Sequence, residues 1–431
     1  MKGKRFLFLS CAFLFLGFAG GELYARNLSL DAAVALVLEQ SNDIKKAEAN
    51  VRKMQATLDG VHANRLPKAD ATAAYMHLAP ISGFSNGVMF GTNYSPNPML
   101  PDNVGSIGVS VSQPIYTFGK IGFAVDMARN GLRIAQSSRR LAEIEMGAAA
   151  VQLYWSARMT DELVKIAEKA LRNTKDAQSK LTATGRANRS NLVKISADVA
   201  SREIDLSDAK FNRDSAHRML KAYAGIEDNE SLVLTSDFPN DFQIAKAKEI
   251  QPLEWSIFES QAKMHDAEKW QNYMGWMPSL VAMGEYKYQT AATEAKALGD
   301  RYTQSASAGI ALTVPLFDGG AKRAAATGAA MAAIAAREDL DKSRRLKTAE
   351  YADLIQKHNH LVKQLKDLLN ARELTDKAYQ LSRDRFLAGQ TSATELSDVE
   401  RASAQMDMVV INAKLQILIT EENIKKYETT K

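Results

Sequence analysis

The sequence has almost no cysteine. Among its 431 residues only Cys11 is a cysteine, and it lies in an apolar run from Phe6 to about Phe18 that follows a short basic segment. The length and flanks of this run favour a secretory signal over a membrane-spanning helix. We therefore predict a signal peptide over residues 1–25 and a mature chain without disulfides or thiol chemistry. A lipid-anchored start at Cys11 stays open, although the residues before it match such a site poorly.

Long apolar runs are absent from the rest of the chain. After the first 25 residues there is no stretch of about 20 apolar residues, which excludes a helical membrane span. This absence does not exclude a membrane β-barrel, because barrel strands are only about ten residues long and only alternately apolar.

Catalytic and metal-binding motifs are absent as well. His358 and His360 are two residues apart on a predicted helix and point to different faces, so they make a poor metal pair. Gly319 and Gly320 lack the Gly-Lys-Ser/Thr ending of a phosphate loop. The 55 basic and 50 acidic residues are mixed along the chain, which is typical of solvated helices. We therefore predict no enzyme activity, no cofactor, no metal and no nucleic-acid partner.

Proline is confined to joints and loops, and two long segments contain none. A proline inside a helix costs about 3 kcal/mol, so its absence indicates continuous helices. We predict helical hairpins over about 119–225 and about 319–427, with tips near Gly185 and Gly389. The first helix of each hairpin would have roughly 65 residues and a length of about 100 Å.

Two strands precede each hairpin. Apolar and polar residues alternate over about 68–77, 105–116, 279–288 and 305–317. One side of these strands is polar, with Lys, Asp, Ser, Glu and Thr side chains. A helix from Ser29 to about Leu66 and another from Leu253 to about Tyr273 precede the two strand pairs. Loops are expected over 78–103 and 289–304.

These elements define two tandem repeats. Residues 26–226 form the first repeat, residues 227–251 form an irregular linker or equatorial segment, and residues 252–431 form the second repeat. Four strands cannot close a barrel, and open edges are not tolerated in lipid. Two chains would supply eight strands around a filled interior, and three chains would supply twelve around a wet lumen. An ordinary soluble antiparallel sheet, polar on one side, is the alternative.

Aromatic residues gather where the strands meet the helices. Such positions fit an aromatic girdle at the membrane interface, or alternatively core packing at the joints. The residues concerned are Tyr116, Phe118, Phe317, Trp270, Tyr273 and Trp276.

The chain resembles the TolC-like outer-membrane efflux protein family over nearly its whole mature length. The resemblance is carried by the opening residues 28–33, by the strand-to-helix elbows 113–116 and 314–320, and by the second tip, residues 385–392, together and in this order. It implies a mainly α chain that forms a homotrimer, with a 12-stranded barrel in the outer membrane and a long α-helical tunnel through the periplasm. It also implies docking of a periplasmic adaptor that is coupled to an inner-membrane transporter.

In this family, charged and polar side chains near the tips hold the tunnel end closed and meet the adaptor. The first tip departs from the usual pattern because it contains two arginines. The residues expected by position are Gly185, Arg186, Asn188, Arg189 and Asn191 in the first tip, and Gly389, Gln390, Thr391, Glu395 and Asp398 in the second. The alternative is that these residues only cap helices and form solvated turns.

Two functions follow from this pattern. The first is the outer-membrane exit duct of a tripartite efflux or type I secretion system in a Gram-negative bacterium, which passively conducts substrates. The second is a periplasmic coiled-coil scaffold or adaptor without a pore, which two tandem hairpins disfavour. The sequence does not specify the exported substrate.

Overall fold

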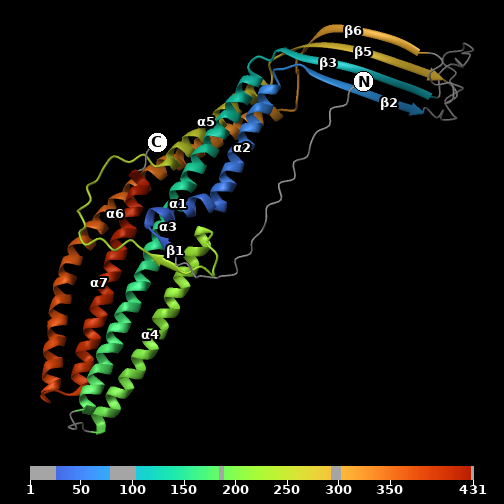
Figure 1. Ribbon diagram of the computed structural model, residues 1–431. Coiled ribbons are helices and arrows are strands. Elements are labelled where there is room, and N and C mark those ends of the chain that lie inside the picture. The colour runs from blue at the N-terminus through green and yellow to red at the C-terminus, as the bar shows by residue number, and fades with distance from the viewer. Residues whose placement is uncertain (1–25, 78–102, 184–188, 293–301, 429–431) are drawn as a thin grey trace, which may run out of the picture. The chain divides into compact units, whose positions relative to one another are not determined.

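The computed structural model describes residues 26–77, 103–183, 189–292 and 302–428. The predicted signal peptide and almost all of the predicted loop 78–103 lie outside these ranges. The described elements are β1 (Arg26–Leu28), α1 (Leu30–Gln40), α2 (Asn42–Ala63), β2 (Lys68–His77), β3 (Asn103–Tyr116), α3 (Lys120–Ala183), α4 (Arg189–Ala224), β4 (Leu232–Leu234), α5 (Leu253–Met274), β5 (Ser279–Ala292), β6 (Tyr302–Thr313), α6 (Ala321–Leu387) and α7 (Ala393–Glu428) (Figure 1).

These elements form two compact units, and each unit takes residues from both repeats. Of the described residues, the first unit comprises those up to Gln40 and those within Ala149–Gln243 and Leu361–Ile419, and it contains the helix ends at the hairpin tips. The second unit comprises the described residues within Ser41–Ala148 and Ile244–His360 and those from Thr420 to Glu428, and it contains the four-stranded sheet.

The long helices confirm the expectation drawn from the proline-free segments. α3 has 64 residues and α6 has 67, and their returning partners α4 and α7 have 36 residues each. The order of helix, two strands, long helix and returning helix occurs twice, as predicted. Within the described ranges, no helix combines the length and the apolar character that crossing a bilayer requires.

The predicted continuous helix from Ser29 to about Leu66 is wrong in one respect. The chain breaks at Ser41, between α1 and α2, because the Ser41 hydroxyl accepts the backbone N–H of Ile44 at 3.3 Å. This side chain therefore caps a new helix instead of continuing the first. Ser29 caps the start of α1, since its hydroxyl accepts the N–H of Ala32 at 3.3 Å.

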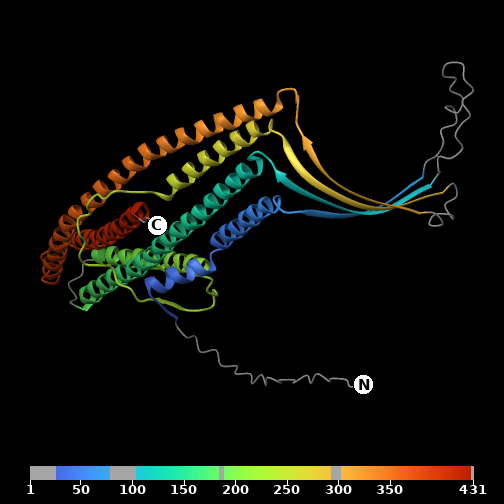
Figure 2. The ribbon, with the colours of Figure 1, turned by 90° about the horizontal axis from the view of Figure 1, so that it is seen from above.

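Four strands form one antiparallel sheet in the second unit, in the order β2-β3-β5-β6. Figures 1 and 2 show it as a single curved layer. β3 and β5, from different repeats, pair at its centre, where Val109 lies opposite Tyr286 and Ser110 lies opposite Glu285. Within the described residues, β2 and β6 are each paired on one side alone, so both edges of the sheet are open.

The register places apolar and polar side chains on opposite faces of the sheet. Ala71, Val109, Tyr286 and Ala306 lie in one row across the four strands. The neighbouring row on the other face consists of Asp70, Ser110, Glu285 and Ser307. All the side chains that the sequence assigns to the polar side fall on that second face, because successive residues of a strand alternate between faces.

The bounds of the last two strands differ from the sequence-based ones. β5 extends to Ala292, four residues farther than expected, and β6 runs from Tyr302 to Thr313 rather than over 305–317. The elbow 314–317 lies outside β6, since Pro315 has no N–H for a strand ladder. After it, Gly319 and Gly320 have positive φ angles of 69° and 88°, which turn the chain into α6.

The part of the linker 227–251 that belongs to the first unit is less irregular than predicted. Its residues 232–234 form β4, which pairs in parallel with β1 over Leu28 and Leu234. The fully buried Tyr154 of α3 holds this pair, because its hydroxyl donates to the Leu28 carbonyl at 3.1 Å and accepts the Ser236 N–H at 2.9 Å. Strands of three residues carry too little periodicity to be found from sequence.

Replacing Tyr154 by phenylalanine tests this attachment. Tyr154→Phe removes both bonds and leaves the Ser236 N–H without its partner, so we expect a loss of about 1–3 kcal/mol in the free energy of unfolding. Urea unfolding of the purified protein measures the change. Tyr223→Phe, at a 44 % exposed position of α4, is the matched control and should change little; equal effects of the two substitutions would contradict this role.

Candidate functional site

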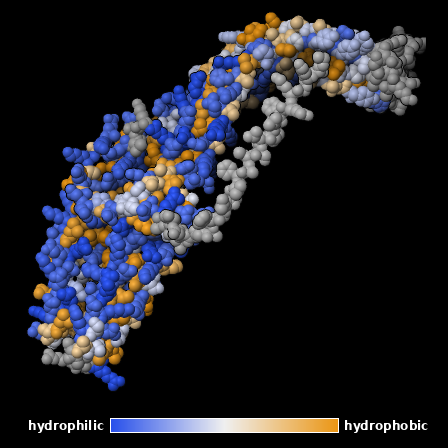
Figure 3. Space-filling view, in the orientation of Figure 1, coloured by the Kyte–Doolittle hydropathy of each residue, from blue (hydrophilic) through white to orange (hydrophobic). Residues whose placement is uncertain are grey.

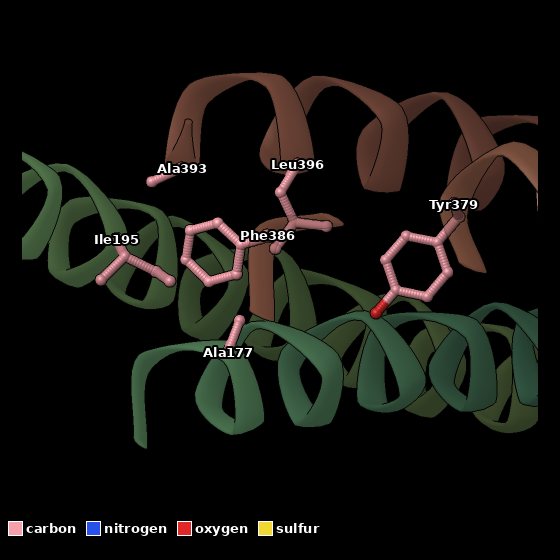
Figure 4. Close-up of a cluster of buried hydrophobic side chains, with 6 residues drawn as sticks. All are labelled: Ala177, Ile195, Tyr379, Phe386, Ala393 and Leu396. Atoms are coloured by element: carbon pink, nitrogen blue, oxygen red, sulfur yellow. The ribbon is translucent and has the colours of Figure 1, made fainter. Parts of the chain in front are cut away.

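The tips of the two hairpins come together in the first unit. α3 ends at Ala183 and α4 begins at Arg189, whereas α6 ends at Leu387 and α7 begins at Ala393. A buried cluster joins all four helix ends. Figure 4 shows Phe386 and Tyr379 of α6, together with side chains of α7, directed toward α3 and α4. The cluster consists of Ala177, Ile195, Tyr379, Phe386, Ala393 and Leu396.

The second tip is a rigid turn. Gly389 has a φ of +75°, its N–H donates to the carbonyl of Phe386 at 3.0 Å, and the N–H of Gln390 donates to the carbonyl of Arg385 at 2.9 Å. This pair of bonds closes a helix with a left-handed residue, and glycine suits that residue because it has no Cβ. Gly389 therefore has a backbone role.

The residues after Gly389 begin α7. The Ser392 hydroxyl accepts the Glu395 N–H at 3.2 Å, which is an N-cap contact. The Thr391 hydroxyl donates to the Glu395 carboxylate. Thus two predicted site residues, Thr391 and Glu395, contact each other, while Gln390 and Asp398 are exposed to solvent.

The first tip is described only in part. Gly185, Arg186 and Asn188 lie outside the described residues. Arg189 is exposed and Asn191 is half-buried in the first turn of α4. Within the described part of the chain, no hydrogen bond or ion pair joins Arg189 to Glu395, so the structure does not bring these opposite charges together as a pair.

Sequence reasoning missed the buried ion pairs between helices of the first unit. Arg202 of α4 donates to Glu400 of α7 at 2.6 Å, and their side chains are only 13 % and 6 % exposed. Lys169 of α3 and Arg372 of α6 lie 3.6 and 2.5 Å from the two carboxylate oxygens of Asp407. The sequence did contain a signal for their burial. Glu400 follows Leu396 by four residues and Asp407 follows Glu400 by seven, so all three lie on the same face of the helix.

The predicted aromatic residues lie at the joints between strands and helices of the second unit. Tyr116 and Phe118 pack edge to face at 4.6 Å, and Phe118 has a φ of +51°. Phe317 is 85 % exposed. Trp270 and Tyr273 form a cluster at the end of α5, with ring centroids 6.0 Å apart, and Phe123, which the sequence reading omitted, stacks on Trp270 at 6.5 Å.

Trp276 lies beside the elbow of the second hairpin. Its ring faces the ammonium group of Lys322 at 5.1 Å. The Asp318 carboxylate accepts the backbone N–H of Lys322 at 3.1 Å and the backbone N–H of Gly320 at 3.0 Å. Asp318 thus caps the start of α6.

The apolar face of the sheet is uncovered. Ile107 is 60 % exposed, Ile310 is 68 % exposed, and Tyr286 is 50 % exposed. Figure 3 shows hydrophobic residues on the surface of the sheet, whereas the helices present a mostly hydrophilic surface. An exposed apolar face of this extent marks a site of contact with lipid or with another protein.

The described residues give no sign of a metal centre. Within these ranges no group of three or more His, Cys, Asp or Glu side chains is placed to hold a metal ion. His358, one of the two histidines considered from sequence, is buried in the second unit, whereas His360 is exposed.

The model of the outer membrane efflux protein family matches residues 33–226 and 259–427. The chain belongs to this family. The two matched segments cover most of both repeats and both hairpins and leave out the whole of the linker 227–251. The family consists of channel proteins rather than enzymes. A search of curated proteins by sequence gives no match.

Solved structures show the same fold for this member of the outer membrane efflux protein family. The VceC outer membrane protein of Vibrio cholerae is 15 % identical with a TM-score of 0.74, and 92 % of this chain and 94 % of that chain are covered. The CmeC outer membrane channel of Campylobacter jejuni is 16 % identical with a TM-score of 0.74, covering 92 % and 85 %. The MtrE outer membrane channel of Neisseria gonorrhoeae, in its open state, is 18 % identical with a TM-score of 0.73, covering 92 % and 88 %. Identities this low establish the fold alone.

A comparison of two glycines tests the turn at the second tip. We expect Gly389→Ala to destabilise the protein by about 1–2 kcal/mol, because a Cβ is disfavoured at positive φ. Gly328→Ala, within α6 with no atom within 4 Å of the added Cβ, should instead stabilise it by about 0.5–1 kcal/mol. Thermal unfolding of both purified variants gives the sign of each effect; a stabilising Gly389→Ala would contradict the rigid-turn assignment.

Proposed function

We propose that this chain is the outer-membrane exit duct of a tripartite efflux or type I secretion system. Three copies form a 12-stranded barrel in the outer membrane of a Gram-negative bacterium, and their helical hairpins form a tunnel through the periplasm. The duct is passive: a periplasmic adaptor and an inner-membrane transporter deliver the substrate.

The open four-stranded sheet carries this proposal. Its two edge strands, β2 and β6, run in opposite directions, so the β6 edge of one copy can pair in antiparallel fashion with the β2 edge of the next. Unpaired edges are not tolerated in hydrocarbon, and pairing between copies removes all of them. Twelve strands, with the polar face inward, leave a wet lumen, whereas eight would be filled by side chains.

The helices of the first unit support the same assembly. α4 exposes Val193, Ile204 and Phe211, each more than 60 % accessible. α6 exposes Leu374 and Leu381, at 67 % and 66 %. The seven-residue steps from Ile204 to Phe211 and from Leu374 to Leu381 are the spacing of a coiled-coil seam. We assign these stripes to contacts between neighbouring copies.

The aromatic residues at the joints fit the lipid interface in this assembly. A ring of Tyr, Trp and Phe side chains borders the apolar band of outer-membrane barrels. The high exposure of Phe317 and the 46 % exposure of Trp270 agree with positions that meet lipid headgroups rather than a protein core.

The tips fit the closing end of the tunnel and the adaptor-docking surface. Arg189, Asn191, Gln390 and Asp398 lie at or near the ends of the hairpins, where Asn191 is half-buried and the other three are exposed. Thr391 and Glu395 have a structural contact with each other as well, so their variants need a stability control. The residues of the first tip outside the described ranges, Gly185, Arg186 and Asn188, stay part of this proposal.

Cysteine pairs between edge strands test the closed barrel. In a Cys11→Ser background, Thr72→Cys on β2 is combined in turn with Thr303→Cys, Ser305→Cys and Ser307→Cys on β6. Within one chain these strands are three strand spacings apart, about 14 Å, which exceeds the reach of a disulfide. We therefore expect oxidation to yield linked dimers and trimers on a non-reducing gel for at least one pair.

A pair at the sheet centre provides the control. Ser110 and Glu285 lie opposite each other within one chain. The double variant Ser110→Cys with Glu285→Cys should therefore form an internal disulfide and still migrate as a monomer on the gel. If the control closes and the whole β2–β6 scan gives monomers alone, the proposed barrel is wrong.

Exchanging charges tests the closing function of the tips. We expect Arg189→Glu and Glu395→Arg to change single-channel conductance in planar bilayers, because a charge in a narrow tunnel end acts directly on passing ions. Glu421→Gln, distant from the tips on α7, is the control. Conductances that equal the wild-type value in both tip variants would argue against a constriction at these residues.

A further inference from the structure

A cluster of buried ionisable groups lies inside the first unit, where the two hairpins pack together. Asp198 of α4, Tyr379 of α6 and Glu400 of α7 are 8 %, 8 % and 5 % exposed. They line one cavity of about 20 Å³, together with Asn173 of α3 and Ser397 of α7. The cavity continues the apolar tip cluster, since Ala177, Ile195 and Leu396 also line it. We name Asp198, Tyr379, Glu400 and the adjoining Arg202 the buried ionic cluster.

Hydrogen bonds satisfy this cluster only in part. Oδ2 of Asp198 is buried and has no hydrogen-bond partner among the described residues, while its Oδ1 lies 3.5 Å from Nζ of Lys194. Glu400 accepts from Arg202 at 2.6 Å, but both side chains are nearly removed from water. The desolvation penalty of such a pair can exceed its Coulomb attraction. Burial accordingly raises the pKa of the Glu400 carboxyl, and the attraction of Arg202 does not offset it.

Charges from all four helices surround the cluster. Arg202, Arg401 and Lys169 oppose the rise in the pKa of Glu400. Burial also raises the pKa of the Tyr379 hydroxyl, and the charge of Glu400 adds to this rise. The other neighbours are Asp176 of α3, Asp205 of α4, Asp376 and Arg383 of α6, and Asp407 of α7. None of these groups supplies Asp198 Oδ2 with a hydrogen bond.

We infer that the buried ionic cluster is a pH-dependent release element, which favours separation of the two hairpins when Glu400 is ionised and holds them together when Glu400 is protonated. Separation returns Arg202, Glu400 and Asp198 to water, whereas the packed state keeps Glu400 and Asp198 beside the small cavity and leaves the Arg202 side chain only 13 % exposed. The inference deepens the proposed function, since it takes separation of the hairpins as the opening of the tunnel end. On this account the Arg202–Glu400 ion pair destabilises the packed state of the hairpins instead of holding it together.

The direction of the pH effect follows from proton binding. In the packed state the pKa of Glu400 lies above its ordinary value, and in separated hairpins it returns to about 4.3. The packed state therefore binds more protons. Packing is most stable below the ordinary pKa and weakens as the pH rises through the packed-state pKa. Each unit of difference between the two pKa values of Glu400 changes the ratio of packed to separated molecules by up to about tenfold.

Distances between spin labels on the two hairpins test this inference. In the Cys11→Ser background, labels at Ser201→Cys on α4 and Ala402→Cys on α7, both exposed, flank the Arg202–Glu400 pair. We expect one short distance at pH 4.5 and a growing long-distance population up to pH 8. Glu400→Gln should lower that population at pH 8, by up to about tenfold for each unit by which the pKa of Glu400 differs between the two states, and it should abolish the pH dependence.

Two further variants make the result decisive. Arg202→Met with Glu400→Leu replaces the pair by apolar side chains, and it should also keep the short distance at every pH; this variant decides the matter if Glu400→Gln alone misfolds. Glu421→Gln, a half-buried acid on the same helix that pairs with Lys425, should respond like the wild type. A pH response that persists in the Glu400 variants, or no response in the wild type, would overturn the inference. The spin-label distances report on the hairpins of one chain and need no assembled barrel. A negative result here would therefore overturn the release element alone, whereas a negative β2–β6 cross-linking scan would overturn the proposed barrel.

Discussion

An unpaired sheet edge is the constraint on which the rest of this structure depends. β2 and β6 each present a row of backbone N–H and C=O groups without partners in the described chain. In water such an edge is a liability, and in hydrocarbon it is not tolerated. The alternation of Val109 and Tyr286 on one face with Ser110 and Glu285 on the other gives the sheet one apolar and one polar surface. In the proposed assembly, further copies of the chain pair with these edges.

The helical part of the first unit combines an apolar interior, buried ion pairs and capped turns. Its interior is apolar near the tips, at Phe386 and Leu396, but it includes ion pairs such as Arg202–Glu400. Rigid caps at Ser392 and Gly389 fix the turn, so that the polar side chains nearby stand on a defined backbone. The combination of a rigid turn with a poorly satisfied interface suits a tip that changes state as whole hairpins rather than by unfolding.

Much of this architecture follows from local sequence patterns. Proline at the joints and its absence over long segments predict the two hairpins, and period-two alternation predicts the strands. The pairing of β3 with β5 joins residues of different repeats, and a single sequence does not specify it. The break at Ser41 was missed because a serine on a helical pattern has no signal that separates a cap from an exposed position.

The site was less predictable than the fold. Gly389 was identified as a turn residue, but the contact of Thr391 with Glu395 depends on the loop geometry. Glu400 and Asp407 were read as members of solvated faces, since a mixed charge pattern is usually that. Only their helical step from Leu396 marks them as buried, and the partners that bury them, Arg202 and Arg372, come from other helices.

The central claim is that separate copies seal one another's sheets, and the number of chains per complex tests it most directly. Native mass spectrometry of the protein extracted from outer membranes in detergent gives that number. The account predicts a complex of three chains that dissociates to monomers only when the protein is denatured. A folded single chain, or a complex of two chains with the sheet intact, would contradict it.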